Sequence, residues 1–140
     1  MPELTVIRSD VRALVSKPFP VGQLARLSPG IGAGWPAPSD DTLWFLTPTL
    51  GPLSTLALHR LSSSAILGVY EWNVEDLATA LGVMRAKAID SLIRLAMFGF
   101  AEVACGEFQV ATWVPPLPHH WRRRLPSHLI GFYDERIKAA

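Results

Sequence analysis

Histidine and cysteine are the residues of this chain whose types could support metal or thiol chemistry. The pair His119-His120 could ligate a metal ion, but adjacent histidines point in different directions on a helix, and no cysteine, aspartate or glutamate stands at ligand spacing. Cys105 is the only cysteine, and nothing near it marks an activated nucleophile, although a redox-sensing thiol stays open as an alternative.

Other catalytic patterns are missing from the sequence. It contains no paired carboxylates, no Ser-His-Asp order and no phosphate-binding loop, and the glycines at 30, 32 and 34 do not make a dinucleotide fingerprint. We therefore predict no metal, no cofactor and no catalytic residue, and we expect that the chain is not an enzyme.

The basic run from His119 to Arg124 has a different chemistry. Its three consecutive arginines, Arg122, Arg123 and Arg124, could each neutralise a phosphate and so contribute salt-dependent affinity for a nucleic acid. They could equally be solvated residues on a short helix whose Trp121 packs inward. The run is a candidate phosphate contact, and both interpretations stay open.

Composition bounds the class of protein that carries these residues. The 140 residues suit one domain with extensions, and a formal net charge of +1 with a pI near 8.0 excludes a strongly basic protein that binds any polyanion. Hydrophobic residues make up 49% and charged residues 18%, which indicates apolar surface that a second subunit or another protein covers. One cysteine and the lack of a long apolar run lead us to expect a cytoplasmic protein.

Residues 1–48 are expected to form an irregular N-terminal arm. Prolines and glycines interrupt this segment, which leaves room for two short helices, at about residues 10–16 and 20–27. Because the arm carries Trp35 and Trp44, we expect it to pack on the rest of the chain or to form a subunit interface, rather than to hang free.

Residues 49–114 show the clearest pattern of alternating elements. A helix is predicted from the N-cap Thr49 to about Ser64, and the elements predicted after it are a strand at 66–72, a helix capped by Asn73 and ended by Gly82, an amphipathic helix at about 85–98, and strands at 100–105 and 108–114 around a Gly106-Glu107 type II′ turn. Residues 115–140 read as a proline linker followed by a C-terminal helix from Ser127 to Ile137.

This order of elements resembles the winged-helix family. The segment Val-Glu-Asp-Leu-Ala-Thr-Ala-Leu-Gly-Val at 74–83, followed by Ile89, Leu92, Leu95 and Phe98-Gly-Phe100, looks like the family's helix-turn-helix core. The resemblance implies an α+β, mainly α fold with a winged helix-turn-helix core, an N-terminal arm and a C-terminal helix.

The resemblance also implies a function, because the second helix of this motif lies in the DNA major groove in the family. The leading expectation is therefore a DNA-binding transcriptional regulator. We expect a homodimer whose terminal arm and C-terminal helix make the interface and whose recognition helices stand about 34 Å apart. The residues expected to contact nucleic acid are Arg85, Lys87, Ser91, Arg94, Arg122, Arg123 and Arg124.

Two departures from the family pattern favour an alternative. Met84 stands where many members have a Ser or Thr that caps the helix and touches a phosphate, and the short wing carries the acidic Glu107. The alternative is a winged helix that serves as a protein-interaction module or adaptor without DNA binding.

Overall fold

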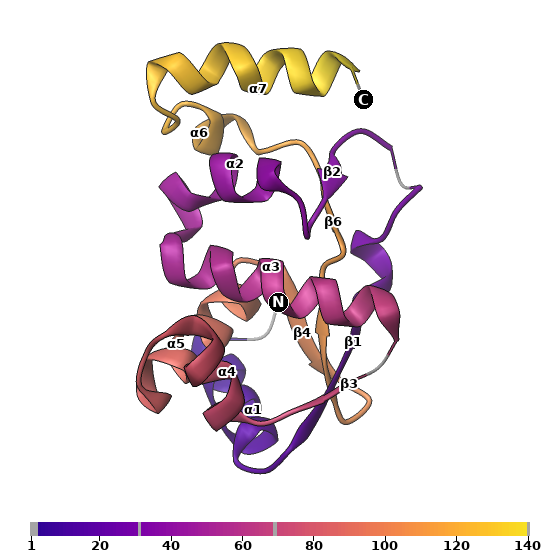
Figure 1. The fold of residues 1–140 in the computed structure, drawn as a ribbon, viewed down its shortest axis with the longest axis vertical. Coiled ribbons are helices and arrows are strands. Elements are labelled where there is room, and N and C mark those ends of the chain that lie inside the picture. Colours follow the sequence, from indigo (N-terminus) through magenta and orange to yellow (C-terminus); the bar gives the residue numbers. More distant parts are fainter. Residues whose placement is uncertain (1–2, 31, 69, 140) are drawn as a thin grey trace.

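The computed structural model describes residues 3–30, 32–68 and 70–139 (Figure 1). The chain is α+β and mainly helical, as predicted. Its elements, in chain order, are α1 (Leu4–Val15), β1 (Phe19–Gln23), η1 (Ala25–Leu27), β2 (Trp35–Pro36), α2 (Asp40–Leu50), α3 (Pro52–Leu67), β3 (Tyr70–Trp72), α4 (Val74–Leu81), α5 (Arg85–Met97), β4 (Ala101–Ala104), β5 (Glu107–Val110), β6 (Trp113–Val114), α6 (His119–Arg122) and α7 (Ser127–Ala139). Within the described ranges, no helix is long and apolar enough to cross a membrane.

The N-terminal segment supplies a central strand, so the helix predicted at 20–27 is wrong over most of its length. β1 lies between β3 and β5 in a four-stranded sheet of order β3-β1-β5-β4. It pairs antiparallel with β3 and parallel with β5, and Phe19 and Val21 are fully buried. Pro20 is tolerated because it faces only β3, since the pairing with β5 begins one residue later, at Val21.

A sharp corner at Gly51 joins α2 to α3. Gly51 has φ 93°, in the region that glycine adopts without steric cost, and Pro52 occupies the first turn of α3. Thr49 was predicted to cap this helix, but it lies inside α2, one residue before that helix ends. α3 continues to Leu67, so the strand predicted at 66–72 shrinks to β3.

The hairpin after α5 turns one residue earlier than predicted. Ala104 pairs with Glu107, so Cys105 and Gly106 form the two-residue turn. Both have positive φ, at 54° and 74°, as a type I′ turn requires. The predicted type II′ turn at Gly106-Glu107 is therefore wrong, and Cys105 is exposed at the tip of the hairpin.

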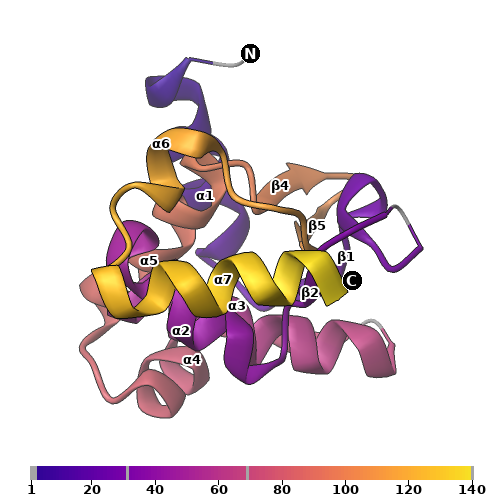
Figure 2. The same cartoon turned by 90° about the horizontal axis from the view of Figure 1, so that it is seen from above.

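The C-terminal segment covers the other end of the molecule. β6 pairs with β2 in a separate two-stranded sheet, so Trp113 lies beside Pro36, whereas Trp72 pairs with Phe19 in the four-stranded sheet. α7 begins at Ser127, as predicted, and lies across α2 (Figures 1 and 2). Along the long axis of the molecule, α7 and α2 stand at one end, and α1 and α4 at the other (Figure 1).

Helix α5 contacts elements that lie both near to it and far from it in the sequence. It packs against α1, α3 and α4 as well as against β4. Its buried side chains are Ala88, Ser91, Leu92, Ile93 and Leu95, which leaves a narrow exposed stripe. How much of α5 a partner can reach is therefore decided by elements far away in the sequence.

Candidate interaction groove and the α4–α5 corner

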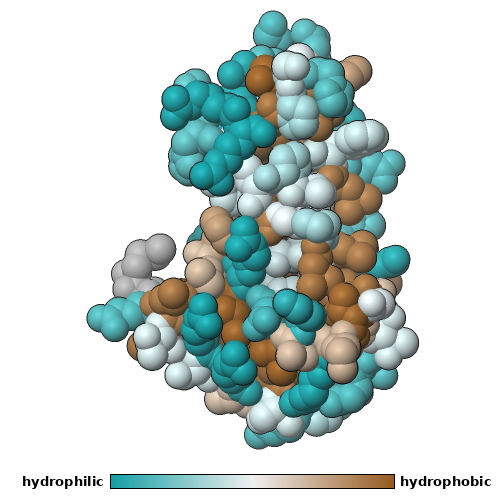
Figure 3. Space-filling view, turned by 90° about the vertical axis from the view of Figure 1, so that its left-hand side faces the viewer, coloured by the Kyte–Doolittle hydropathy of each residue, from teal (hydrophilic) through white to brown (hydrophobic). Residues whose placement is uncertain are grey.

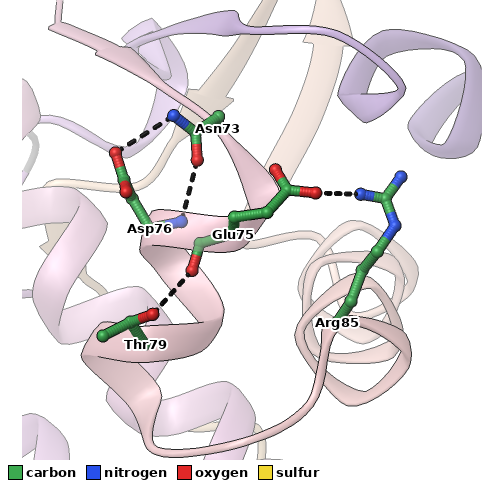
Figure 4. Close-up of polar contacts among 5 residues, drawn as sticks. All are labelled: Asn73, Glu75, Asp76, Thr79 and Arg85. Carbon is green, nitrogen blue, oxygen red and sulfur yellow. Dashed lines mark hydrogen bonds and ion pairs between the residues drawn. The ribbon is translucent and has the colours of Figure 1, made fainter.

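Local contacts build the α4–α5 corner, and Figure 4 shows them. The Asn73 side chain accepts a hydrogen bond from the backbone N–H of Asp76 at 2.8 Å and donates one to its carboxylate at 3.0 Å (Figure 4). Gly82 ends α4 in the left-handed conformation, with φ 70°. The predicted cap and stop of this helix are both confirmed.

The first turn of α5 holds two of the predicted nucleic-acid contacts. Arg85 forms a 2.7 Å ion pair with Glu75 of α4, and both side chains are exposed (Figure 4). Lys87 is exposed and forms no ion pair with any residue that the structure describes. Of these two cations, only Lys87 is therefore uncompensated.

Two other predicted contacts on α5 serve the fold. Ser91 is only 3% exposed and its hydroxyl donates to the Ala88 carbonyl, so its predicted place on the solvent face is wrong. The Arg94 guanidinium donates to the carbonyl oxygens of Leu50, at 2.6 Å, and Thr49, at 3.3 Å, at the end of α2. Ser91 is buried because α3 packs on that side of α5, where the Ser54 hydroxyl donates to the Ser91 carbonyl. Arg94 is exposed, as predicted, although its guanidinium binds the end of α2.

One of the three C-terminal arginines is engaged within the fold, and the other two are exposed. Arg122 forms a bidentate ion pair with Asp134 of α7, at 2.9 and 2.6 Å, so it is not a freely solvated cation. These hydrogen bonds hold the pKa of the Asp134 carboxyl below its usual value and raise that of Arg122. Arg123 and Arg124 are exposed.

Trp121 packs inward, as one interpretation of the basic run expected. It meets the rings of Phe98 and Phe100 with centroid distances of 5.5 and 6.0 Å. Phe98 follows the last turn of α5, so α6 lies at that end of the helix, while Lys87 lies about 15 Å away along the axis. Exposed Arg94 lies at the same end of α5 as α6, with its guanidinium 4.8 Å from the centroid of the Phe98 ring, whereas Lys87 stands apart.

The segment 70–110, which contains α4 and α5, is acidic. Residues 70–110 carry six acidic and three basic side chains, a formal charge of −3, whereas the whole chain has +1. The acidic residues are Glu71, Glu75, Asp76, Asp90, Glu102 and Glu107. Figure 3 shows brown hydrophobic patches between the hydrophilic ones at the height of α4 and α5, and Met84, just before α5, is 81% exposed.

A groove lies between α2 and α7. Its volume is about 630 Å³. Trp44 of α2 and Phe132 of α7 line it and are 58% and 68% exposed, while Phe45 and Leu129 form a buried floor. Large aromatic side chains with this much exposure are unusual on a free protein surface and typical of interfaces.

Charged side chains border the groove. Arg136 of α7 forms a 2.7 Å ion pair with Asp41 of α2, which ties the two helices together. Exposed His128 and Glu135 also line it. An apolar floor with a charged border is the usual anatomy of a protein-binding surface.

An aromatic cluster beneath the groove keeps its floor rigid. The rings of Trp35, Phe45 and Tyr133 contact one another at centroid distances of 5.4 to 6.2 Å, mostly edge to face. The Trp35 indole donates to Thr42, and the Tyr133 hydroxyl accepts from the backbone N–H of Leu117 at 2.7 Å. Trp35 was predicted as an interface residue, but at 2% exposure it belongs to the core.

We predict that Tyr133→Phe destabilises the fold by about 1–3 kcal/mol at neutral pH, because it leaves the buried Leu117 N–H without its acceptor. Burial raises the pKa of Tyr133, so the folded state favours the neutral phenol. That stabilisation is complete below the ordinary tyrosine pKa of 10.0 and is lost as the pH rises through the folded-state value.

Urea unfolding of wild type, Tyr133→Phe and Tyr70→Phe at pH 7 and at alkaline pH measures both effects. Tyr70, which is exposed, is the matched control. Tyr133→Phe should lose less stability than wild type on going to high pH. Equal losses in the two proteins would contradict the role given to the buried phenol.

Phe132 is the groove residue that the sequence did not single out. Its position off the apolar stripe of α7, which consists of Leu129, Ile130, Tyr133 and Ile137, was the sequence signal that could have identified it.

The described residues contain no group of three or more histidine, cysteine or acidic side chains that could hold a metal. Comparisons of the chain with protein-family models, with curated protein sequences and with solved structures found no match.

Proposed function

We propose that the protein is a protein-interaction module built on a winged-helix core, and that its binding surface is the groove between α2 and α7. The observation that carries the proposal is the pair of exposed aromatic side chains, Trp44 and Phe132, above a rigid apolar floor. No catalysis is part of this proposal.

The energetics favour a protein partner at this groove. Transfer of apolar surface from water contributes about 25 cal/mol per Å². Trp44 and Phe132 offer such surface without the cost of desolvating a charge, and the aromatic cluster fixes the floor before any partner arrives. Aromatic residues of this kind are the usual centres of binding energy in protein interfaces.

The acidic charge of residues 70–110 also favours a protein partner over DNA. DNA binding depends on cations that neutralise phosphates, yet the elements that would approach the duplex carry −3. Arg85 is compensated by Glu75, and the Arg94 guanidinium is bound to the end of α2. The acidic Glu75 and Asp76 stand in the first turn of α4, where HTH proteins approach the DNA backbone.

DNA binding by α5 is the second candidate. The observation in its favour is the order α3, β3, α4, α5, β4, β5, with Lys87 exposed on α5 and Arg123 and Arg124 exposed beyond α6. A regulator of this kind would have to use these cations, because the others are engaged within the fold.

Titration of a fluorescent mixed-sequence duplex with the full chain separates the two candidates. Our proposal expects no binding at about 50 mM salt, whereas phosphate contacts would give an affinity that falls steeply with salt. If binding occurs and Lys87→Ala or Arg123→Ala/Arg124→Ala weakens it, the proposal is overturned. Arg94→Ala is unsuitable as a probe, since it is expected to weaken the α2–α5 contact.

Photocrosslinking tests the groove directly. A benzophenone amino acid replaces Trp44 in one variant and Tyr70, an exposed aromatic on the edge strand β3, in the control. In the producing cell, the position 44 variant should give a discrete covalent adduct with a protein, and the position 70 variant should not. Equal labelling at both positions would count against a specific groove.

A further inference from the structure

The strand β4 forms one edge of the four-stranded sheet, next to β5 (Figure 2). The Phe100 carbonyl accepts a backbone hydrogen bond, at 2.8 Å, from the residue that follows β5. Successive residues of an antiparallel strand direct their N–H and C=O groups to opposite sides, so Glu102 also faces β5, while Ala101 and Val103 face away. Within the described ranges, no backbone hydrogen bond outside the hairpin engages Ala101 or Val103. This edge is therefore open to pairing with another strand.

The same two residues point their side chains toward the helices. Val103 lies opposite Phe108 of β5, which is fully buried in the core, and directly opposed residues share one face of a sheet. Ala101, two residues earlier, lies on that face as well, and Glu102 lies on the other. A strand added to β4 would alternate in the same way, with every second side chain on the helix side.

A groove of about 450 Å³ lies beside this edge. Its apolar wall comes from α1, the end of α5 and β4, and consists of Ile7, Val11, Ala96, Met97, Ala101 and Val103. Ile7, Met97 and Val103 are only partly buried. Leu4, one turn before Ile7 on α1, is 44% exposed and continues the wall. Apolar surface and unused main-chain groups therefore stand side by side.

The charged residues of the groove are Asp10, Glu102 and Arg26, all exposed. The Arg26 guanidinium donates to the Gly99 carbonyl at 3.0 Å. Neither carboxylate forms an ion pair with a residue that the structure describes. Two negative charges and one positive charge leave the groove at −1. A cation directly opposite Glu102 on an added strand would be attracted to its carboxylate.

We propose that this groove binds an extended segment of another protein, which adds to β4 as an antiparallel strand. Two apolar residues of the segment lie opposite Ala101 and Val103, exchange main-chain hydrogen bonds with them and enter the groove. The residue between the two is Lys or Arg, opposite Glu102. This surface is additional to the groove between α2 and α7, because the two share no lining residue.

The charge of Glu102 disfavours a second copy of this chain at the same edge. Two antiparallel β4 strands that use both outward-facing residues would place each Ala101 opposite the partner's Val103. This register puts Glu102 opposite the partner's Glu102, and like charges at directly opposed positions are destabilising. A segment with a cation at that position is complementary instead.

Fluorescence anisotropy of a labelled nine-residue peptide, titrated with the full chain, tests the site. The peptide has Val-Lys-Val at its centre and three threonines on each side, and wild type should bind it with a Kd below about 500 µM. N-methylation of both valines should weaken binding at least about tenfold, because it removes the N–H groups that bond β4. N-methylation of the lysine, whose N–H points away from β4, is the matched control and should cost less than about threefold.

Two variants of the chain test the strand edge and its charge. Val103→Pro removes an outward N–H but leaves the bonds between β4 and β5, and it should weaken binding at least about tenfold. Glu102→Lys should weaken binding about fivefold or more, and a peptide with Glu in place of Lys should restore the affinity to within about threefold. Glu71→Lys, the same charge change on the opposite edge strand β3, is the control and should bind as wild type does. Urea unfolding checks that each variant is folded.

Each outcome decides one part of the proposal. Unchanged anisotropy of the wild-type mixture up to about 500 µM chain overturns the site. Binding that tolerates the methylated valines, or that folded Val103→Pro retains, overturns the added strand. Binding that Glu102→Lys leaves unchanged overturns the preference for a cation. None of these results bears on the groove between α2 and α7, which crosslinking at position 44 tests separately.

Discussion

Gly34→Ala is expected to destabilise the protein by about 3 kcal/mol or more. Gly34 has φ 129°, and a β-carbon there would overlap the carbonyl oxygen of Val114 and lie 2.9 Å from the indole nitrogen of Trp113. Relief of this overlap must separate β2 from β6. That separation would move Trp35, on which the floor of the groove depends.

Gly32→Ala is the matched control for this substitution. Gly32 has a similar φ of 119° but nothing within 4 Å of its β-carbon position among the described atoms. Gly32→Ala should lower the free energy of unfolding by only about 1–2 kcal/mol, the cost of holding alanine in a left-handed backbone conformation. Urea unfolding followed by tryptophan fluorescence measures both variants, and equal losses would show that the close approach of Gly34 to β6 does not matter.

Removal of residues 1–24 is expected to abolish cooperative folding. The deletion removes α1 and β1 with five buried apolar residues, Val11, Val15, Phe19, Val21 and Leu24. At about 1.5–3 kcal/mol for each, their loss is comparable to the roughly 5–15 kcal/mol free energy of unfolding of a typical domain. The deletion also leaves β3 and β5 without the strand that joins them.

Circular dichroism and urea titration of the truncated chain test this expectation. Leu4→Ser/Val6→Ser, at exposed positions of α1, is the control and should unfold much like wild type. A synthetic peptide of residues 1–24, added in excess, should restore cooperative unfolding to the truncated chain. A truncated chain that unfolds cooperatively by itself would show that β1 is dispensable.

The parts of the fold that were predicted correctly depend on local chemistry. The Asn73 cap, the Gly82 stop and the start of α7 at Ser127 are each decided by residues within a few positions. For the same reason the amphipathic pattern of α5 located that helix to within one residue. Local signals therefore identified most of the helices.

The errors occur where distant segments meet. Pro20 is typical of a first helical turn, and only pairing with Glu71 and the neighbouring strand makes its segment extended. Ser91 has the spacing of a solvent-facing residue, but the packing of α3 against α5 buries it. The groove combines Trp44 and Phe132, which lie far apart in the sequence, so no local pattern could bring them together.

The position of β1 has a consequence for the order in which the chain acquires its structure. Val21 pairs with Phe108, a contact about 90 residues long in sequence, and closing it requires most of the chain to be present. During synthesis, the N-terminal strand must wait with its apolar side chains exposed until β5 has been made. Folding is therefore expected to be slow for a protein so rich in helix, with the sheet completed last.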